Sequence, residues 1–211
     1  MVTLACAAVL FDVDGTLIDS TPLIERAARL WAVEYGIDAE EFLSGAHGRR
    51  TGDRVAEFLP PERAREAAGH LDAIEATLTE GITALPGALD LLGGMDGLPW
   101  ALVTSMDRGQ LAVRSDVAGV GLPPVVVTAD DVVHGKPDPS GYRLAADRLG
   151  VDPARCVVFE DAPAGIAAGR AAGATVVAVT TSHDPAELSG AHHIVRDLSF
   201  VRPVPGGLRI G

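Results

Sequence analysis

Short hydrophobic runs recur along the chain, and stretches with a helical spacing of apolar residues separate most of them. The runs cover residues 5–11, 100–103, 125–128, 156–159 and 175–179. Each run is too short for a stable helix, and most are bounded by Gly, Pro or Asp, so the pattern predicts β-strands. Their hydrophobic residues do not alternate with polar ones, which is typical of a parallel sheet covered on both faces.

Two of the intervening stretches carry signals for the start and the end of a helix. Asp138 can cap a helix with Pro139 in its first position, and Gly150 would end it. The apolar face of that helix would consist of Tyr142, Ala145, Ala146 and Leu149. A second helix is predicted over residues 163–172, ending at Gly173. This alternation predicts an α/β fold with a doubly wound, Rossmann-like parallel sheet.

Residues 17–86 interrupt the alternation, because they show helical patterns only. The first helix is predicted to begin at Thr21 and to end at Gly36. Its apolar face would consist of Leu23, Ala27 and Leu30. A capping-box spacing at 38 and 41 and a proline pair at 60–61 indicate further helices towards residue 80. Because the stretch is too long for a simple connection, we expect a small all-α cap domain at 17–86. Residues 1–16 and 87–211 would form the α/β core, joined to the cap through 17–20 and 81–87.

Composition is that of a folded globular domain and disfavours several kinds of partner. Hydrophobic residues make up 47% and charged residues 22% of the 211 positions, and the formal net charge is −12. This charge disfavours binding to nucleic acid or to an anionic membrane. No apolar run approaches the roughly 18 residues of a membrane span, and the first ten residues lack the basic start of a signal peptide. Cys6 and Cys156 lie in apolar runs, as free thiols do in the reducing cytoplasm, where we expect the protein to act.

The sequence DVDGT at 12–16 directly follows the first predicted strand. Alternation along an extended chain puts Asp12 and Asp14 on one side, and open α/β sheets bind their ligands at this edge. Gly15 lets the chain leave the strand in a conformation that other residues avoid. An EF-hand loop is excluded, because it needs a third ligand before its glycine and flanking helices. A D-x-D glycosyltransferase metal site and a solvated acidic turn remain alternatives.

A second acidic pair, Glu160 and Asp161, follows the strand predicted at 156–159. Carboxylates from two strand ends suit Mg²⁺, which binds through a few oxygen ligands and keeps positions for water and phosphate. The alternative is structural, since Asp161 could cap the helix that Pro163 opens. The sequence therefore indicates a metal site at the strand ends while leaving a helix cap possible.

Candidates for phosphate binding follow two further strands. Lys136 is the only lysine among 17 basic residues, and its ammonium group can be aimed at a phosphate oxygen as a point charge. A surface position in a turn is the alternative for this lysine. Thr104 and Ser105 follow the strand at 100–103, where a hydroxyl and the N–H groups of the next helix could hold phosphate. Capping of that helix is the alternative for these two residues.

Taken in order, these motifs resemble those of the haloacid dehalogenase (HAD) superfamily, in particular its phosphatase branch with an α-helical cap inserted after the first motif. The matching segments are DVDGTL at 12–17, VTS at 103–105, GKPDP at 135–139 and FEDAPAG at 159–165. Ala162 departs from the family pattern, in which a serine often follows the acid pair. In the predicted cap, AHGRRT at 46–51 is similar to the His-Gly-x-Arg-Thr stretch of sugar-phosphate and glycerol-phosphate phosphatases.

The resemblance implies a chemical role for each motif residue. Asp12 would be the nucleophile that forms an aspartyl-phosphate. Asp14 would protonate the leaving alcohol and then activate water. Lys136 would offset the negative charge around the transferred group, and Thr104 with the Ser105 backbone would hold a phosphoryl oxygen.

The resemblance also implies a Mg²⁺ cofactor and a substrate-binding cap. The metal ligands would be the Asp12 side chain, the Asp14 backbone carbonyl, Asp161, and Glu160 either directly or through water. In the cap, His47, Arg49 and Arg50 are candidates for binding the substrate, with a solvated basic turn as the alternative.

Together these features predict a Mg²⁺-dependent phosphatase that hydrolyses small phosphorylated metabolites, with sugar or polyol phosphates as the expected substrates. A β-phosphoglucomutase-like mutase is the first alternative, because the core motifs would be the same. A protein that keeps the fold and the metal site only to bind a partner is the second. The expected partner is a small-molecule phosphate ester, and the chain is expected to be a monomer or a weak homodimer.

Overall fold

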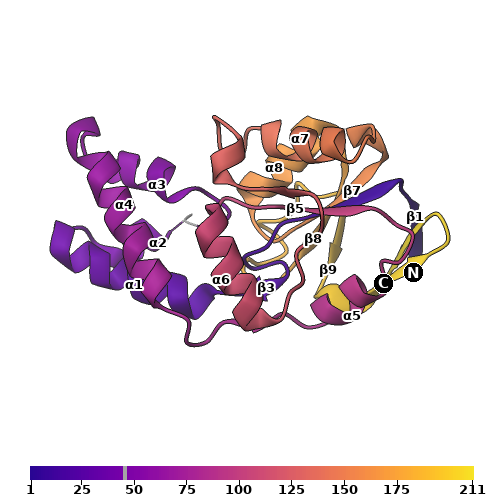
Figure 1. Ribbon diagram of the computed structural model, residues 1–211, viewed down its shortest axis with the longest axis horizontal. Helices are drawn as coiled ribbons and strands as arrows, with labels where there is room; N and C mark the ends of the chain where they lie inside the picture. Colours follow the sequence, from indigo (N-terminus) through magenta and orange to yellow (C-terminus); the bar gives the residue numbers. More distant parts are fainter. Residues whose placement is uncertain (45–46) are drawn as a thin grey trace.

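The computed structural model describes residues 1–44 and 47–211. Six parallel strands form its main sheet in the order β6–β5–β2–β7–β8–β9 (Figure 1). The strands are β2 (Ala8–Phe11), β5 (Trp100–Val103), β6 (Val126–Val127), β7 (Cys156–Glu160), β8 (Thr175–Val179) and β9 (His193–Val195). The prediction of a parallel sheet is confirmed, and each of the five hydrophobic runs contributes one strand to it.

Successive residues of the strands enter opposite sides of this sheet. Ala8 and Leu10 of β2 belong to a buried cluster with α7 (Ser140–Arg148) and α8 (Pro163–Ala172). Val9 and Phe11 belong to a second cluster with α5 (Ala88–Gly93) and α6 (Arg108–Ala118). Helices therefore cover both faces of the sheet (Figure 1), and the predicted doubly wound α/β fold is confirmed.

The limits of the core helices follow local signals closely. α8 ends at Gly173, whose φ of 95° lies in the left-handed region, as predicted. α7 begins at Ser140, one residue later than predicted, and Asp138 Oδ1 accepts a hydrogen bond from the Ser140 N–H at 2.9 Å. Three short 3₁₀ helices lie in the connections: η1 (Ala129–Asp131), η2 (Pro153–Arg155) and η3 (Leu198–Phe200).

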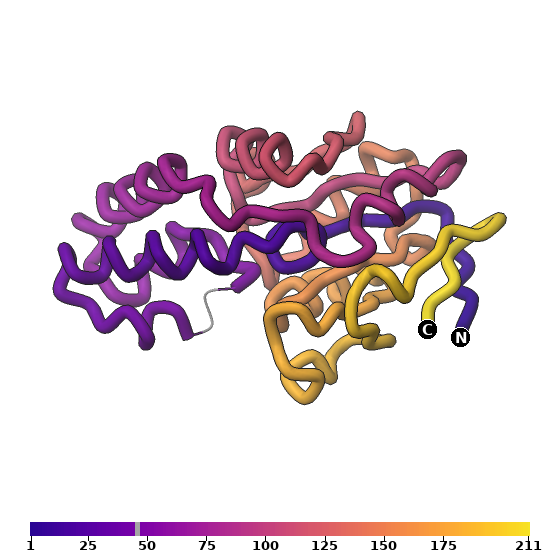
Figure 2. The backbone as a smooth tube through the Cα atoms, turned by 90° about the horizontal axis from the view of Figure 1, so that it is seen from below, coloured from indigo at the N-terminus to yellow at the C-terminus, as the bar shows by residue number. Residues whose placement is uncertain are grey.

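Four helices, which we call the helical part, lie together beside the sheet (Figure 2). They are α1 (Thr21–Tyr35), α2 (Ala39–Leu43), α3 (Thr51–Phe58) and α4 (Pro61–Thr77). Their buried side chains form a separate hydrophobic cluster that includes Trp31, whose indole N–H donates to the Ala67 carbonyl at 2.8 Å. Leu30 is 50% exposed, so its predicted place on the buried face of α1 is wrong. Trp31 and Ala32 occupy that face together with Leu23 and Ala27.

The chain enters and leaves the helical part through a short antiparallel pair, β3 (Ile18–Asp19) and β4 (Thr83–Ala84). The prediction that residues 17–86 are helical only is therefore wrong at both ends. Hydrogen bonds between the two connections hold the outgoing and the returning chain side by side. This arrangement places the start of α1 next to the loop that follows β2, where Ser20 Oγ donates to Asp14 Oδ1 at 2.6 Å.

The two ends of the chain form a second sheet, which the sequence pattern did not predict. β1 (Val2–Ala5) pairs antiparallel with β11 (Gly207–Ile210), which pairs with β10 (Val201–Val204). The termini accordingly lie side by side (Figure 2). The prediction of one strand over residues 5–11 is wrong, because β1 and β2 belong to different sheets.

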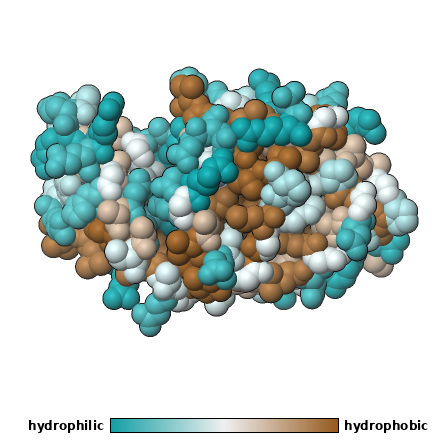
Figure 3. Space-filling view, in the orientation of Figure 1, coloured by the Kyte–Doolittle hydropathy of each residue, from teal (hydrophilic) through white to brown (hydrophobic). Residues whose placement is uncertain are grey.

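The surface differs between the two parts of the molecule. In the view of Figure 3, hydrophilic side chains cover the upper left, over the helical part, whereas hydrophobic side chains gather over the α/β part. Across the residues that the structure describes, no helix combines the length and hydrophobicity needed to cross a bilayer.

Candidate active site

A cavity separates the carboxyl ends of β2 and β5 from the helical part. Asp12, Asp14, Thr104 and Ser105 line it from the side of the sheet. His47, Arg49 and Glu75 are among the residues that line it from the opposite side. The other two candidate cations, Lys136 and Arg50, border a smaller adjoining cavity that shares Thr104 and Ser105.

Three buried carboxylates meet beside the cavity, and that of Asp12 lines it. Asp12, Glu160 and Asp161 each offer an oxygen within 4.8 Å of the others. Asp12 follows β2 and Asp161 follows β7, and these strands are hydrogen-bonded neighbours in the sheet. The side-by-side strand ends therefore bring together acids that are 149 positions apart in the sequence.

Lys136 lies between two of these acids. Its Nζ donates to Asp12 Oδ1 and, at 2.6 Å, to Glu160 Oε1. The side chain is buried, so the alternative of a surface lysine in a turn is wrong. Burial lowers the pKa of Lys136, but the adjacent Asp12 and Glu160 outweigh it and raise the pKa above its ordinary value. The lysine therefore stays charged and holds both carboxylates in place.

Glu160 is surrounded by hydrogen-bond donors. Besides Lys136, Tyr142 Oη donates to its Oε1 at 2.7 Å. Its Oε2 accepts from the N–H groups of Asp161 and Ala162 at 3.1 and 3.3 Å. Because four donors already occupy both oxygens, this arrangement favours an indirect part for Glu160 at a metal site.

Asp161 does not cap α8, so that alternative is wrong. The cap position belongs to Ala162, and no side chain makes a cap hydrogen bond there. Asp161 Oδ1 instead accepts from Thr16 Oγ1 at 3.3 Å, and its Oδ2 accepts from Ser182 Oγ. The left-handed Gly15 makes room for the carboxylate, since a Cβ there would lie 2.1 Å from Asp161 Oδ2.

The donor set fits a divalent cation of the Mg²⁺ type. Asp12 Oδ2 is buried and has no hydrogen-bond partner among the described residues. Burial raises the pKa of Asp12 well above its ordinary value, and burial together with Glu160 raises the pKa of Asp161 to about 7. When all three carboxylates are ionised, they carry more negative charge than Lys136 alone can neutralise. Hard oxygen ligands with excess negative charge are what Mg²⁺ requires.

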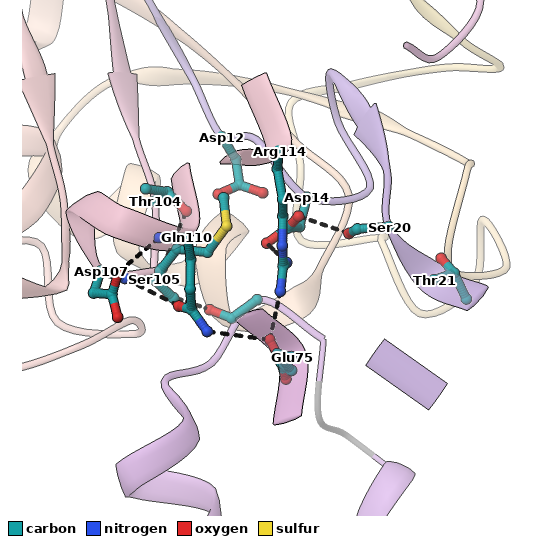
Figure 4. A network of polar contacts seen from close by, with 12 residues as sticks. Asp12, Asp14, Ser20, Thr21, Glu75, Thr104, Ser105, Asp107, Gln110 and Arg114 are labelled. Carbon is teal, nitrogen blue, oxygen red and sulfur yellow. Dashed lines mark hydrogen bonds and ion pairs between the residues drawn. The ribbon is translucent and has the colours of Figure 1, made fainter. Parts of the chain in front are cut away.

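The Asp14 carboxylate is held by two other side chains, those of Ser20 and Arg114 (Figure 4). Ser20 donates to its Oδ1, and Arg114 Nη1 of α6 donates to its Oδ2 at 2.8 Å. The second terminal nitrogen of Arg114, Nη2, forms an ion pair with Glu75 of α4. Burial raises the pKa of Glu75 to about 7, because the nearby Arg114 offsets it only in part.

Arg114 and Glu75 were not among the site residues predicted from the sequence. A signal for Arg114 exists in the pattern of α6, where Leu111 and Ala118 are buried at helical spacing and Arg114 falls on the same face. A charged residue on an apolar stripe predicts a buried partner. Nothing in the local pattern points to Glu75 as that partner.

Thr104 and Ser105 do not cap the following helix. α6 is capped by Asp107, which forms a capping box with Gln110. Thr104 Oγ1 accepts from the Met106 N–H at 3.1 Å, and Ser105 Oγ donates to the Gly48 carbonyl at 2.9 Å. Ser105 therefore joins the sheet edge to the helical part beside the cavity.

The candidate substrate-binding residues of the helical part have different surroundings. His47 lines the cavity with its ring centroid 5.5 Å from that of His183, and burial followed by His183 lowers the pKa of His47. Arg49 lines the cavity but pairs with Glu57 at 2.6 Å. Arg50 donates to the carbonyls of residues 132 and 133, so it links the helical part to the core. Ala46, the first residue of the AHGRRT run, lies outside the described residues.

Replacing Gly165 with alanine tests the position of Glu160. A Cβ at Gly165 would lie 1.6 Å from Glu160 Oε1, so we expect Gly165→Ala to lower the free energy of unfolding by about 1–3 kcal/mol. Urea unfolding measures this change. Gly69→Ala is the matched control, since a Cβ at this exposed position of α4 meets no atom within 4 Å. The control should be more stable than wild type by about 0.5–1 kcal/mol. Equal stability of both variants would contradict the described packing around Glu160.

Comparison with known proteins identifies the family. The model of the haloacid dehalogenase-like hydrolases matches residues 6–173. The chain belongs to this family. Hexitol phosphatase A of Escherichia coli (strain K12) is 43% identical over 201 residues, which cover 93% of each protein. 2-Deoxyglucose-6-phosphate phosphatase 1 of Saccharomyces cerevisiae is 38% identical over 221 residues, covering 92% of this chain and 89% of that protein.

A solved structure supports the same assignment of this HAD-like hydrolase. The crystal structure of a hydrolase from Pseudomonas syringae superposes with a TM-score of 0.85 at 28% identity, covering 92% of this chain and 94% of that one. The predicted family and the prediction of a phosphoric monoester hydrolase are thus confirmed. A glycosyltransferase metal site is excluded as the explanation of the DVDGT motif.

Proposed function

We propose that this HAD-like hydrolase is a Mg²⁺-dependent phosphatase that acts on small sugar or polyol phosphates through an aspartyl-phosphate. The arrangement of Asp12 beside the cavity carries the proposal. Lys136 holds its Oδ1, while its Oδ2 has no hydrogen-bond partner in the described part of the chain. A buried carboxylate oxygen that no donor occupies is costly for stability. Such an oxygen is what nucleophilic attack on a phosphoryl group requires.

The reaction would take place in two steps. In the first, a carboxylate oxygen of Asp12 forms a bond to phosphorus while the bond between phosphorus and the ester oxygen breaks. Asp14 gives its proton to the departing alcohol. In the second step, Asp14 takes a proton from water, whose oxygen binds phosphorus as the bond to Asp12 breaks. Inorganic phosphate leaves, and both carboxyl groups return to their starting states.

Positive charge and hydrogen-bond donors must surround the transferred group, because a carboxylate and a phosphate dianion repel each other. Lys136 supplies one such charge from beside Asp12. Thr104 and the Ser105 N–H would hold a phosphoryl oxygen. Asp12, the Asp14 carbonyl and Asp161 would hold Mg²⁺, which neutralises charge on the phosphoryl oxygens when bound. Glu160 would act on the metal site indirectly, because donors already surround it.

We also propose that residues 17–86 form the cap domain of this enzyme and enclose the alcohol part of the substrate. Apolar side chains from the helical part, including Ile24, Phe42 and Leu71, line the cavity together with the polar Glu75 and Gln110. A mixed lining of this kind suits a short carbon chain with hydroxyl groups. The names of the two curated relatives point to the same class, since one is a hexitol phosphatase and the other a 2-deoxyglucose-6-phosphate phosphatase.

The charge of the helical part favours a phosphatase over the mutase alternative. A mutase that returns its phosphoryl group to an intermediate must bind a second phosphate at the far end of the cavity. Arg49 and Arg54 are the arginines of the helical part that line the cavity, and both already pair with Glu57, which neutralises part of their charge. Arg54 also donates to the carbonyls of residues 42 and 44. The described residues thus favour a substrate with one phosphate.

A substrate panel tests the proposed function. The purified protein with Mg²⁺ should release one inorganic phosphate for each alcohol formed from hexitol, hexose and glycerol phosphates. Conversion of β-glucose 1-phosphate to glucose 6-phosphate without phosphate release would establish the mutase instead. If no ester is hydrolysed, the proposal is wrong and a role in binding follows. The expected cytoplasmic location and monomeric or weakly dimeric state remain predictions, and gel filtration tests the second.

Magnesium is expected to stabilise the protein, and more strongly at pH 8 than at pH 6. Since the pKa of Asp161 rises from 3.8 to about 7, the folded chain holds a proton that the unfolded chain has lost, and stability falls as the pH rises through this interval. Mg²⁺ binds the deprotonated carboxylate and replaces that proton. At a fixed concentration of 100 times its Kd at pH 8, the ion should raise Tm by about 5–10 °C at that pH, and by less at pH 6, where proton competition raises the Kd. Thermal unfolding with and without Mg²⁺ measures the shift, and an undiminished shift in Asp161→Asn would contradict the site.

A further inference from the structure

A chain of polar contacts joins Asp14 to the helical part of the molecule (Figure 4). Arg114 stands in the middle of the chain, with Nη1 on Asp14 Oδ2 at 2.8 Å and Nη2 on Glu75 Oε2. Gln110, one turn before Arg114 on α6, adds a hydrogen bond to Glu75 at 3.3 Å. On the other side of Asp14, Ser20 donates to Oδ1 at 2.6 Å. Both oxygens of the Asp14 carboxyl thus have a partner that fixes its orientation.

The residues at both ends of this series of contacts, Ser20 and Glu75, do not have the roles that would be usual at their positions. Ser20 occupies the N-cap position of α1, but its hydroxyl makes no cap hydrogen bond and binds Asp14 instead. The side chain of Arg114 is only 3% exposed and that of Glu75 only 10%. Burying such a pair costs desolvation energy that its attraction barely offsets, and well-packed apolar residues would serve stability equally well. The arrangement therefore indicates a purpose other than stability.

Within the described ranges, Arg114–Glu75 is the only buried ion pair between the helical part and the core. The planar guanidinium presents two nitrogens in a fixed fork and can hold two carboxylates at once, which a lysine ammonium on its flexible stem does less well. Because Nη2 of Arg114 is paired with Glu75, only Nη1 is left to bind Asp14. Without Glu75, both nitrogens are free to bind Asp14 and draw its carboxyl away from the cavity.

We propose that Arg114 is a positioning residue that sets the Asp14 carboxyl for proton transfer to the leaving alcohol, and that Glu75 of α4 holds Arg114 in the required place. The inference rests on the proposed function, since it assumes that Asp14 protonates the alcohol. It gives Arg114 and Glu75, which lie outside the four HAD motifs, a part in catalysis. It also makes proton delivery depend on the docking of the helical part against the core.

Two esters that differ in leaving group separate this role from a structural one. An alkoxide is a strong base and must be protonated as it leaves, whereas p-nitrophenolate is a weak base and leaves without a proton. kcat/KM reports the steps up to release of the alcohol. In Glu75→Gln and Arg114→Lys we expect kcat/KM for glycerol 1-phosphate to fall about 10²-fold. The value for p-nitrophenyl phosphate should fall less than about 5-fold, because acid catalysis contributes little there.

Three reference variants make the result decisive. Asp14→Asn should show the same split between the esters with a larger loss. Arg108→Lys, an exposed ion-paired arginine on the same helix, should leave both values unchanged. Asp12→Asn should abolish both reactions. Circular dichroism and Tm establish that each variant is folded, and Glu75→Gln is the variant expected to fold best because the amide keeps the shape of the carboxylate while it loses the charge that holds Arg114.

The possible outcomes distinguish failure of this inference from failure of the proposed function. An equal fall for both esters in folded Glu75→Gln and Arg114→Lys, or no fall for either, would overturn the positioning role. Absence of a split in Asp14→Asn itself would instead show that Asp14 is not the acid. Full activity of Asp12→Asn would overturn the proposed reaction as a whole.

Discussion

Replacing Asp12 with asparagine is expected to abolish phosphate release while leaving the fold intact. An amide cannot form the acyl phosphate, so kcat should fall by about 10⁴-fold or more with every ester. Asparagine has nearly the same shape, and it removes one negative charge from the buried group with Glu160 and Asp161. Because burial raises the pKa of Asp12 well above its ordinary value, the neutral side chain should be tolerated without loss of stability. Release of phosphate from p-nitrophenyl phosphate and Tm without metal are the measurements.

Asp38→Asn is the matched control for Asp12→Asn. Asp38 caps α2 by accepting a hydrogen bond from the Glu41 N–H at 2.9 Å, and asparagine caps helices equally well. The control should therefore retain full activity and stability. Retained turnover by a folded Asp12→Asn protein would remove Asp12 as the nucleophile and, with it, the proposed reaction.

The α/β core could be predicted from the sequence because its elements depend on short-range patterns. Runs of four or five apolar residues between Gly, Pro and Asp are too short for a stable helix and are typical of buried parallel strands. The glycines at 36 and 173 end their helices because each adopts a left-handed conformation. Patterns of this kind involve residues close together in the chain, so no knowledge of the tertiary structure is needed to interpret them.

The candidate site could be predicted in part for a topological reason. Parallel strands bring their carboxyl ends to one edge, so polar residues directly after neighbouring strands must approach one another. This rule accounts for the approach of Asp12 and Asp161, which follow the paired strands β2 and β7. Lys136 could be predicted as a site residue because it is the only lysine in the chain. Only the structure shows that it is buried between Asp12 and Glu160.

The features that could not be predicted depend on contacts between distant segments. β1 and β11 pair across almost the whole chain, and no local pattern encodes that register. Arg49 and Arg50 are adjacent and chemically alike, yet one lines the large cavity and the other binds backbone carbonyls of the core. The sequence around Glu75 is typical of the charged face of an amphipathic helix. Only the packing of α4 against α6 shows that Glu75 has a buried partner, Arg114.

Replacing Lys136 with methionine is expected to cost both activity and stability. Loss of the preorganised positive charge beside the transferred phosphoryl group should lower kcat/KM by about 10²–10³-fold or more. Removing one partner of a buried ion pair leaves the carboxylates of Asp12 and Glu160 without their common donor, so the free energy of unfolding should fall by about 3–5 kcal/mol. Urea unfolding and phosphate release measure the two losses, and Arg108→Met on the exposed face of α6 is the control that should show neither.

The two losses in Lys136→Met should be separable, because they have different causes. Adding Glu160→Gln removes one of the uncompensated charges, so the double variant should regain much of the stability but none of the activity. The remaining deficit should grow as the pH rises. Burial raises the pKa of Asp12 and Lys136 lowers it; without the lysine, the folded chain holds a proton over a wider range, and stability falls as the pH rises through that range. If the double variant regained activity together with stability, Lys136 would serve the fold alone, and the positive charge required beside Asp12 would have to come from another group.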